Sequence, residues 1–394
     1  MKNFTTDIQR FCLMCLLLTL QTSCSKNDTT QLIKIDVTKN YPEKKLYIQD
    51  IADVEYVSLE TDDNFLFSYL LGVSDNFVVC GNHVENSFVF FDRKTGKPVS
   101  KINRYGNGPE EYNLPATSVY SEADDEFFIL DYPVGIKVYG KNGTYKRKLS
   151  FRERSYIGAP EAFYNYDANN LMYYDGFQGS INDYPTAFVL VSKLDGRVTK
   201  EIEIPYEKKV SLMFTNKLDG EVMVGRMPNV HFAVRNGGDF LLTEYSADTV
   251  YRFTPEQELI PFLVREPAIQ TTDPKIILHS MLETRDYLFF STNKLEIDKN
   301  LQQDFQPKGL LMEKKTGNFY QTNVQMKNYE GKELILGPSF LSRFSNDNQT
   351  GFFALPTSEL MDANESGQLS GSLKEIAGRL TENDEVVVMM MRFK

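Results

Sequence analysis

The sequence predicts an all-β fold, a six-bladed β-propeller formed by one domain. Three observations indicate this fold. Short apolar strands separated by turn residues recur about every 40–70 residues, a period typical of propeller repeats. Amphipathic helices are scarce, and aromatic residues make up 13% of the chain, a load that packing between blades explains. Because one four-stranded unit cannot bury both of its faces alone, such units close into a ring.

The N-terminus indicates export. Lys2 and Arg10 precede the apolar run at residues 11–20, which is too short to span a bilayer as a helix of about 20 residues. This run fits the apolar region of a signal peptide. The following pair, Ser23-Cys24, resembles the lipobox of bacterial lipoproteins. The resemblance implies that residues 1–23 are a signal peptide and that Cys24 is lipidated. The alternative is an ordinary cleaved signal followed by an incidental cysteine.

Polar residues follow Cys24, so residues 24–45 are predicted to be a lipidated N-terminus and flexible tether, and residues 46–394 the propeller. Lys26 followed by Asp28 is similar to the surface-export signal of some Bacteroidota lipoproteins. The predicted location is therefore the cell envelope, anchored by lipid to the outer membrane on its periplasmic or surface face. Cys80 is the cysteine that is left in the body, within an apolar run. We expect it to be a core residue without a disulfide.

Five units of a strand, a hairpin and a further strand are visible, at residues 75–102, 125–149, 170–204, 238–264 and 286–320. The sequence Asn142-Gly143 between two apolar runs is a strong hairpin signal. A sixth unit is split, and we expect the N-terminal run 51–59 to pair with the C-terminal run 386–391 and close the ring. One helix is predicted at residues 372–380, on the rim. A large β-sandwich or two β domains is the alternative.

Residues 104–112 read Arg-Tyr-Gly-Asn-Gly-Pro-Glu-Glu-Tyr, with Pro115 after them. This stretch resembles the RxGxGPxEY motif of the six-bladed β-propeller lipoproteins of gut Bacteroidota, and it also resembles the linker of NHL-repeat propellers. Residues 53–61 are similar to the opening strand of the same lipoprotein family. The resemblance implies a binding or scaffold protein, without a settled activity or ligand.

The same nonapeptide holds the candidate site residues. Its two glycines permit close backbone approach, and its other members bring charges and rings together. The candidate residues are Arg104, Tyr105, Asn107, Glu110, Glu111 and Tyr112. Two interpretations stay open: a loop that contacts a ligand at one mouth of the propeller, or a structural turn between blades.

Catalytic and metal motifs are not evident. His83, His231 and His279 lack ligand spacing, no calcium loop of the Asp-x-Asp-x-Asp-Gly type occurs, and no Gly-x-Ser-x-Gly elbow is present. We therefore predict no catalytic residue, no metal and no cofactor. Residues 173–184 combine tyrosines, glycines and polar groups. They could stack on sugar rings or form a plain long loop.

The formal net charge of −11 argues against nucleic acid as a partner. We expect a monomeric binding or protein-interaction module rather than an enzyme, with a glycan, peptide or protein as partner. The alternatives are a propeller hydrolase or lyase acting on a polysaccharide, and a structural partner of a membrane complex.

Overall fold

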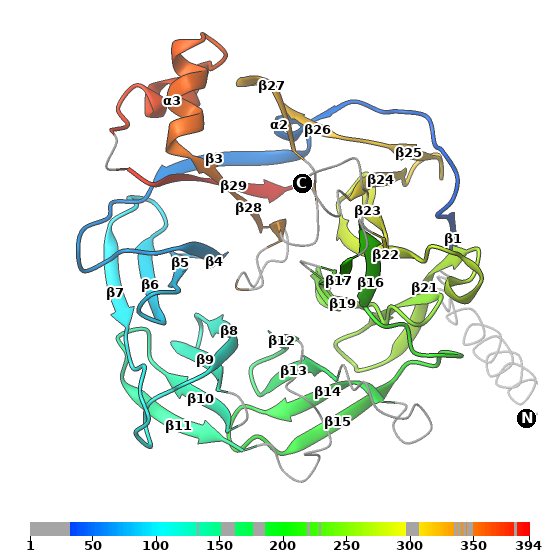
Figure 1. Ribbon diagram of the computed structural model, residues 1–394, viewed down its shortest axis with the longest axis horizontal. Coiled ribbons are helices and arrows are strands. Elements are labelled where there is room, and N and C mark those ends of the chain that lie inside the picture. The colour runs from blue at the N-terminus through cyan, green and yellow to red at the C-terminus, as the bar shows by residue number, and fades with distance from the viewer. Residues whose placement is uncertain are drawn as a thin grey trace, which may run out of the picture.

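The computed structural model describes residues 32–131, 134–150, 162–175, 186–218, 221–227, 230–296, 307–334, 336, 340–341, 344, 350–381 and 384–394. These residues form a β-propeller, with sheets arranged around a centre (Figure 1). In the first three sheets along the ring, four consecutive strands pair as an antiparallel meander. They are β4 (Tyr69–Val73), β5 (Phe77–Asn82), β6 (Ser87–Asp92) and β7 (Pro98–Ile102); β8 (Pro115–Ser121), β9 (Glu126–Asp131), β10 (Gly135–Tyr139) and β11 (Tyr145–Leu149); and β12 (Ala162–Asn165), β13 (Asn170–Tyr174), β14 (Thr186–Ser192) and β15 (Val198–Glu203).

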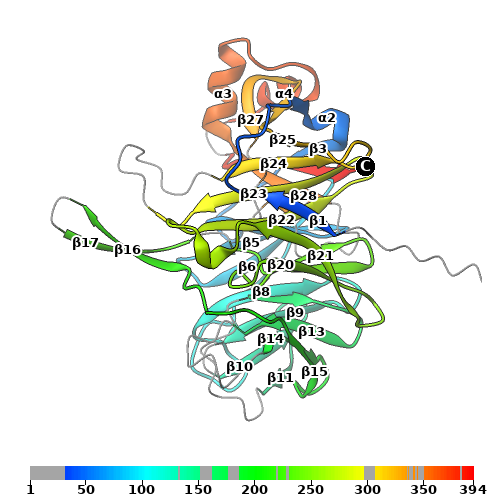
Figure 2. The same cartoon turned by 90° about the vertical axis from the view of Figure 1, so that its right-hand side faces the viewer.

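Two further meanders follow the hairpin of β16 (Met213–Leu218) and β17 (Glu221–Arg226), which projects from one side of the ring (Figure 2). They are β18 (Ala233–Asn236), β19 (Asp239–Leu242), β20 (Thr249–Phe253) and β21 (Leu259–Glu266); and β22 (Ile276–Glu283), β23 (Tyr287–Lys294), β24 (Lys308–Glu313) and β25 (Phe319–Gln321). A short 3₁₀ turn at Ile269–Thr271 joins the two. The strands that the sequence predicts in all five units are confirmed.

The ring closes as the sequence predicts. The C-terminal strand β29 (Val386–Phe393) pairs on one side with β28 (Thr350–Pro356) and on the other with the N-terminal strand β3 (Ala52–Ser58). Both pairings are antiparallel, and the second runs from the pair Val387–Ser58 to the pair Phe393–Ala52. The two ends of the propeller are therefore joined by a sheet, which leaves the strand edges at the junction paired.

The predicted number of six blades is wrong. Among the described residues, seven sheets have three or more strands, and counted in this way the propeller has seven blades. The additional sheet consists of β2 (Leu46–Tyr47), β26 (Val324–Met326) and β27 (Tyr329–Leu334). Its strands are short, and β2 comes from the other end of the chain. β2 and β26 have only two and three residues, too few to produce a visible alternation of apolar and polar positions, and β27 has a polar middle between its buried ends, so the sequence pattern gives no clear sign of this sheet.

The folded part of the chain begins before residue 46, where the sequence places the start of the propeller. Strand β1 (Ile33–Asp36) pairs in parallel with β21 along the outer edge of its sheet. The chain then passes the ends of β24 and β25. Lys44 forms an ion pair of 2.7 Å with Glu313 of β24, and the rings of Tyr41 and Phe319 of β25 lie 5.5 Å apart. Residues 33–47 are thus a strap around the rim, and residues 1–31 lie outside the described residues.

Three helices accompany the sheets in the described part of the chain. The predicted helix is confirmed as α4 (Gly371–Ala377), which buries Leu373 and Ala377. Two more were not predicted: the single turn α2 (Ile48–Ile51), and α3 (Thr357–Glu365), which lies outside the ring in Figure 1. Of the residues that the structure describes, no helix combines the length and the apolar character that a membrane span requires.

Aromatic residues pack between neighbouring sheets, as the composition suggests. The rings of Phe90 and Tyr120 lie 5.1 Å apart and those of Phe88 and Phe127 lie 4.8 Å apart, joining β6 to β8 and β9. Cys80 is fully buried and free, which confirms its place in the core. Burial also raises the pKa of its thiol well above the ordinary value.

The meander pattern gives the propeller two distinct faces. Because consecutive strands alternate in direction, the hairpins within strand pairs one–two and three–four lie on one side, which we call the turn face. The connections between second and third strands, and those from one sheet to the next, lie on the other side, which we call the loop face. Residues 103–114, 205–212, 243–248 and 267–275 belong to the loop face.

Candidate functional site

The nonapeptide 104–112 lies on the loop face and connects β7 to β8. Its backbone folds back on itself, because Gly106 N donates to the Tyr112 carbonyl at 2.9 Å and Tyr112 N donates to the Arg104 carbonyl at 3.0 Å. The Tyr112 ring is fully buried, and its hydroxyl donates to the carbonyl of Asn86 at 2.7 Å. Burial raises the pKa of this tyrosine. Tyr112 therefore serves as an internal anchor of the turn.

The glycines of the motif leave room for the side chain of Glu111. A Cβ atom on Gly106 would overlap the carboxylate of Glu111. That carboxylate accepts a hydrogen bond from the backbone N–H of Gly108 at 2.8 Å. Glu111 is thus occupied inside the loop, where it satisfies a backbone donor that the tight turn leaves without a carbonyl partner.

Side chains of the next blade bind the second half of the motif. The Tyr139 hydroxyl donates to the Glu110 carbonyl at 2.8 Å, and the Lys137 ammonium donates to the Glu111 carbonyl. Lys137 also forms an ion pair of 3.4 Å with Asp131, and both side chains are buried. One Asp131 oxygen accepts the backbone N–H groups of the two residues after the motif, each at 2.9 Å. These contacts clasp the connection to β9 and β10.

The remaining motif side chains divide between structure and solvent. Arg104 donates through Nε to the carbonyl of Gly143 at 3.0 Å, which ties the motif to the β10–β11 turn. Asn107 accepts a hydrogen bond from the side chain of Asn113. Tyr105, 49% exposed, and the Glu110 side chain face solvent. The geometry therefore favours the interpretation of the motif as a structural turn between blades. Tyr105 and Glu110 are the two motif side chains that the loop face presents to solvent without a described partner role in the turn.

A pocket of about 460 Å³ opens elsewhere on the loop face. It is formed by the connection that follows β15, the connection between β21 and β22, and the residue after β23. Its lining is Lys208, Lys209, Val210, Ser211, Gln270, Asp273, Pro274, Lys275 and Leu295. The pocket therefore combines ammonium, hydroxyl and amide groups with a small apolar surface. The Gln270 amide donates to the Lys208 carbonyl at 2.7 Å and joins the two connections.

A buried ionic cluster supports one wall of this pocket. Lys209 lies 2.9 Å from Glu244, a carboxylate with 1% exposure, and its ammonium also lies 2.7 Å from the Tyr174 hydroxyl. That hydroxyl donates to Glu244 at 2.6 Å. The Tyr174 ring stacks on Phe232 with centroids 3.6 Å apart. Glu244 is satisfied by these partners, as a buried carboxylate has to be, and it fixes Lys209 at the pocket.

A family model described as a domain of unknown function, DUF4934, matches residues 32–392. The chain belongs to the DUF4934 family. The match begins one residue before β1 and ends within β29, so it includes the strap and the strand that closes the ring. Among curated proteins, none matches this chain.

Solved structures resemble this DUF4934 protein in fold. One is a protein of Bacteroides fragilis NCTC 9343 that is named provisionally as an exported protein. Its TM-score is 0.61 and its identity is 15%, and the alignment covers 92% of this chain and 99% of that protein. A second is a member of the DUF4221 family from Bacteroides vulgatus, with a TM-score of 0.49 and 11% identity over 88% of this chain and 99% of the other. At such identities the first likeness establishes the fold alone.

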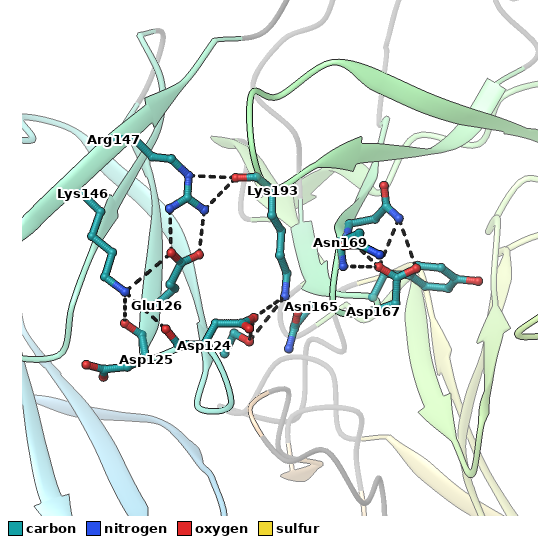
Figure 3. Close-up of polar contacts among 12 residues, drawn as sticks. Asp124, Asp125, Glu126, Lys146, Arg147, Asn165, Asp167, Asn169 and Lys193 are labelled. Carbon is teal, nitrogen blue, oxygen red and sulfur yellow. Dashed lines mark hydrogen bonds and ion pairs between the residues drawn. The ribbon is translucent and has the colours of Figure 1, made fainter.

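Ion pairs between blades of the DUF4934 propeller are concentrated around the turn face. Figure 3 shows Arg147 of β11 forming two hydrogen bonds with Glu126, at 2.6 and 2.7 Å. Its guanidinium also donates to the Lys193 carbonyl in the next sheet, and the Lys193 ammonium lies 2.9 Å from Asp124. These residues join β8–β11 to β12–β15. Since every charge in this set has a partner, within the sheet or across to the next one, the arrangement is structural.

The histidines of the DUF4934 protein do not form a metal site in the described residues, where no group of three or more His, Cys, Asp and Glu side chains gathers. His83 stacks on Tyr69 with centroids 4.3 Å apart. Tyr245 links the other two, because its hydroxyl donates to the carbonyl of His231 and lies 2.8 Å from Nδ1 of His279. Burial lowers the pKa of His279 to about 4, so this ring is neutral at pH 7.

The sequence did not identify the pocket. Of the segment 173–184, Tyr173, Tyr174 and Asp175 are buried, and residues 176–185 lie outside the described residues. Tyr174 does reach the candidate site, but as part of the wall that holds Lys209 rather than as an exposed platform. Lys208, Lys209 and Lys275 carried no sequence signal, because isolated lysines are typical of any protein surface.

Proposed function

We propose that this DUF4934 protein is an exported, lipid-anchored propeller of the cell envelope that binds a glycan in the loop-face pocket. The single observation that carries the proposal is the pocket itself, built from three separate connections on a sheet scaffold. Its volume of about 460 Å³ lies within the range of small-ligand sites, roughly 300–1,000 Å³. Loops held by a rigid scaffold are where binding residues concentrate.

The chemistry of the lining favours a sugar over a peptide. Six of the nine lining residues carry polar side chains, and the apolar remainder is Val210, Pro274 and Leu295. Such a set of donors and acceptors suits a ligand rich in hydroxyl groups. A peptide held in extended form takes its affinity from main-chain pairing along a sheet edge, and the pocket is lined by connections rather than by an edge strand.

A glycan array with the purified protein tests the proposal. Ser211→Trp should fill the pocket and abolish the glycan signal. Ser366→Trp, placed at the exposed end of α3, is the matched control and should bind as the wild type does. Binding to peptides alone, or glycan binding that survives Ser211→Trp, would overturn the assignment. Incubation with each bound glycan followed by mass analysis distinguishes capture from cleavage, since a shortened product would establish an enzyme.

The lipid anchor is a separate part of the proposal, supported by Ser23-Cys24 at the end of the signal-like region. Cys24→Ala should move the protein from the membrane fraction to the soluble fraction of the envelope. Ser25→Ala is the control and should leave the protein with the membrane. Retention of the Cys24→Ala protein in membranes would refute lipidation at this residue.

A further inference from the structure

The pocket carries positive charge within an acidic molecule. Lys208, Lys209 and Lys275 line it, while Asp273 is the acidic residue of the lining. Adding the buried Glu244 that partners Lys209 gives three cations against two carboxylates, a local excess of one positive charge. The chain as a whole has a net charge of −11. The charge of the pocket is therefore opposite in sign to the net charge of the chain.

Two of the three ammonium groups have no counter-ion within the described part of the chain. Among the residues that the structure describes, no carboxylate lies within 4 Å of the Nζ atom of Lys208 or of Lys275, whereas Lys209 has Glu244. Lys275 donates to the backbone carbonyls of Ile269 and Gln270 at 3.2 and 3.5 Å. These carbonyls hold the side chain in place without neutralising it. Lys208 is exposed at the rim of the pocket.

The wall between these lysines is fixed by buried contacts. Glu244 accepts the backbone N–H of Ser246 at 2.9 Å, and the Ser246 hydroxyl accepts the backbone N–H of Val210 at 2.9 Å. With the Lys209–Glu244 pair, these bonds hold residues 208–211 against the β19–β20 connection. Lys208 and Lys275 come from two different connections and line one pocket. Because the segment of Lys208 is held from behind, the wall is already ordered, which limits the ordering cost of binding.

We infer that the pocket recognises an anionic group on the glycan, a carboxylate or a sulfate ester, through Lys208 and Lys275. This inference rests on the proposed glycan-binding function and names the class of sugar. Lys209 is a positioning residue, since its charge is matched by Glu244. Ammonium groups donate charge-assisted hydrogen bonds to such anions, and the loss of one of them lowers affinity by about tenfold or more.

Titration calorimetry with paired oligosaccharides tests the inference. The ligands are a glucuronate-containing oligosaccharide, its sulfated counterpart and the neutral glucose analogue. We expect an acidic member to bind at least about tenfold more tightly than the neutral one, and this preference to shrink as sodium chloride rises. Lys208→Gln and Lys275→Gln should each weaken acidic binding about tenfold and weaken neutral binding by a clearly smaller factor, because glutamine keeps a hydrogen-bond donor but loses the charge. Lys94→Gln, an exposed lysine on the turn face, is the control and should have no effect.

The outcomes separate the two proposals. Preference for the uronate or for the sulfate identifies which anion the pocket takes. Equal binding of acidic and neutral sugars, unaffected by both lysine variants, would overturn the inference and leave the glycan-binding function standing. Failure of every sugar to bind would remove the proposed function and this inference with it.

Discussion

Replacing Asp131 by alanine should destabilise the propeller strongly, because this residue clasps the 104–112 connection to the next blade. Its side chain is 2% exposed and that of its partner Lys137 is 6% exposed. The substitution leaves the Lys137 ammonium buried without its carboxylate, which costs about 3–5 kcal/mol. It also removes the acceptor of two backbone N–H groups, at Asn113 and Leu114, which lie near the surface and can turn to water.

A double-mutant cycle isolates the pair. Asp131→Ala, Lys137→Met and the double variant are unfolded in urea and followed by circular dichroism. Replacing both charges by apolar groups removes the unpaired ion, so the double variant should be more stable than the sum of the single losses predicts, by about 1–3 kcal/mol. Additive losses would refute the reasoning that the two charges depend on each other. Sugar binding should be unchanged in every variant that folds, because the clasp lies in another connection from the pocket.

Three other predictions concern the scaffold. Gly96→Ala should lower the melting temperature more than Gly317→Ala does in calorimetry; both glycines have positive φ, but only at Gly96 would a Cβ overlap a carbonyl, that of Ser58. Burial lowers the pKa of His279 from the ordinary value of 6.5 to about 4. Between these two pH values the unfolded chain is protonated at this residue and the folded protein is not. Stability should therefore fall by about 3 kcal/mol as pH drops from 6.5 to 4, and His279→Gln should remove this part of the slope in urea titrations. Cys80 should resist thiol reagents in the native protein and react after unfolding, as peptide mapping would show, because it is fully buried and its thiol pKa is raised; rapid labelling of the folded protein would contradict its place in the core.

The sequence predicts the second to fourth strands of the five meanders well and their innermost strands poorly. Strands such as β9 and β14 are continuous apolar runs, and their hairpins carry recognisable turn residues. The first strand of each sheet lies nearer the centre of the ring, where polar groups are buried. In β8, for example, Ser118 and Ser121 are 3% and 2% exposed. Buried polar residues break the apolar pattern on which strand prediction depends.

The candidate site shows a similar limit. The motif at 104–112 is visible in the sequence because its residues are contiguous, but its role depends on Asp131, Lys137 and Tyr139 in the next blade. The pocket joins residues 208–211 to residues 270–275, and Lys209 finds Glu244 35 positions away. The packing of neighbouring sheets and their connections brings such residues together, and no local spacing rule describes the result.

The direction of β1 sets the side from which the chain enters the propeller, and with the proposed lipid on Cys24 it also sets which face lies towards the membrane. Because β1 runs parallel to β21, which leads from the turn face towards the loop face, the chain enters the propeller from the turn side. Nine residue steps separate Cys24 from Ile33, a reach of at most about 30 Å. A lipid on Cys24 would hold the propeller close to the bilayer with its turn face inward. The loop-face pocket would then point away from the membrane, where it is accessible to polymers in the surrounding medium.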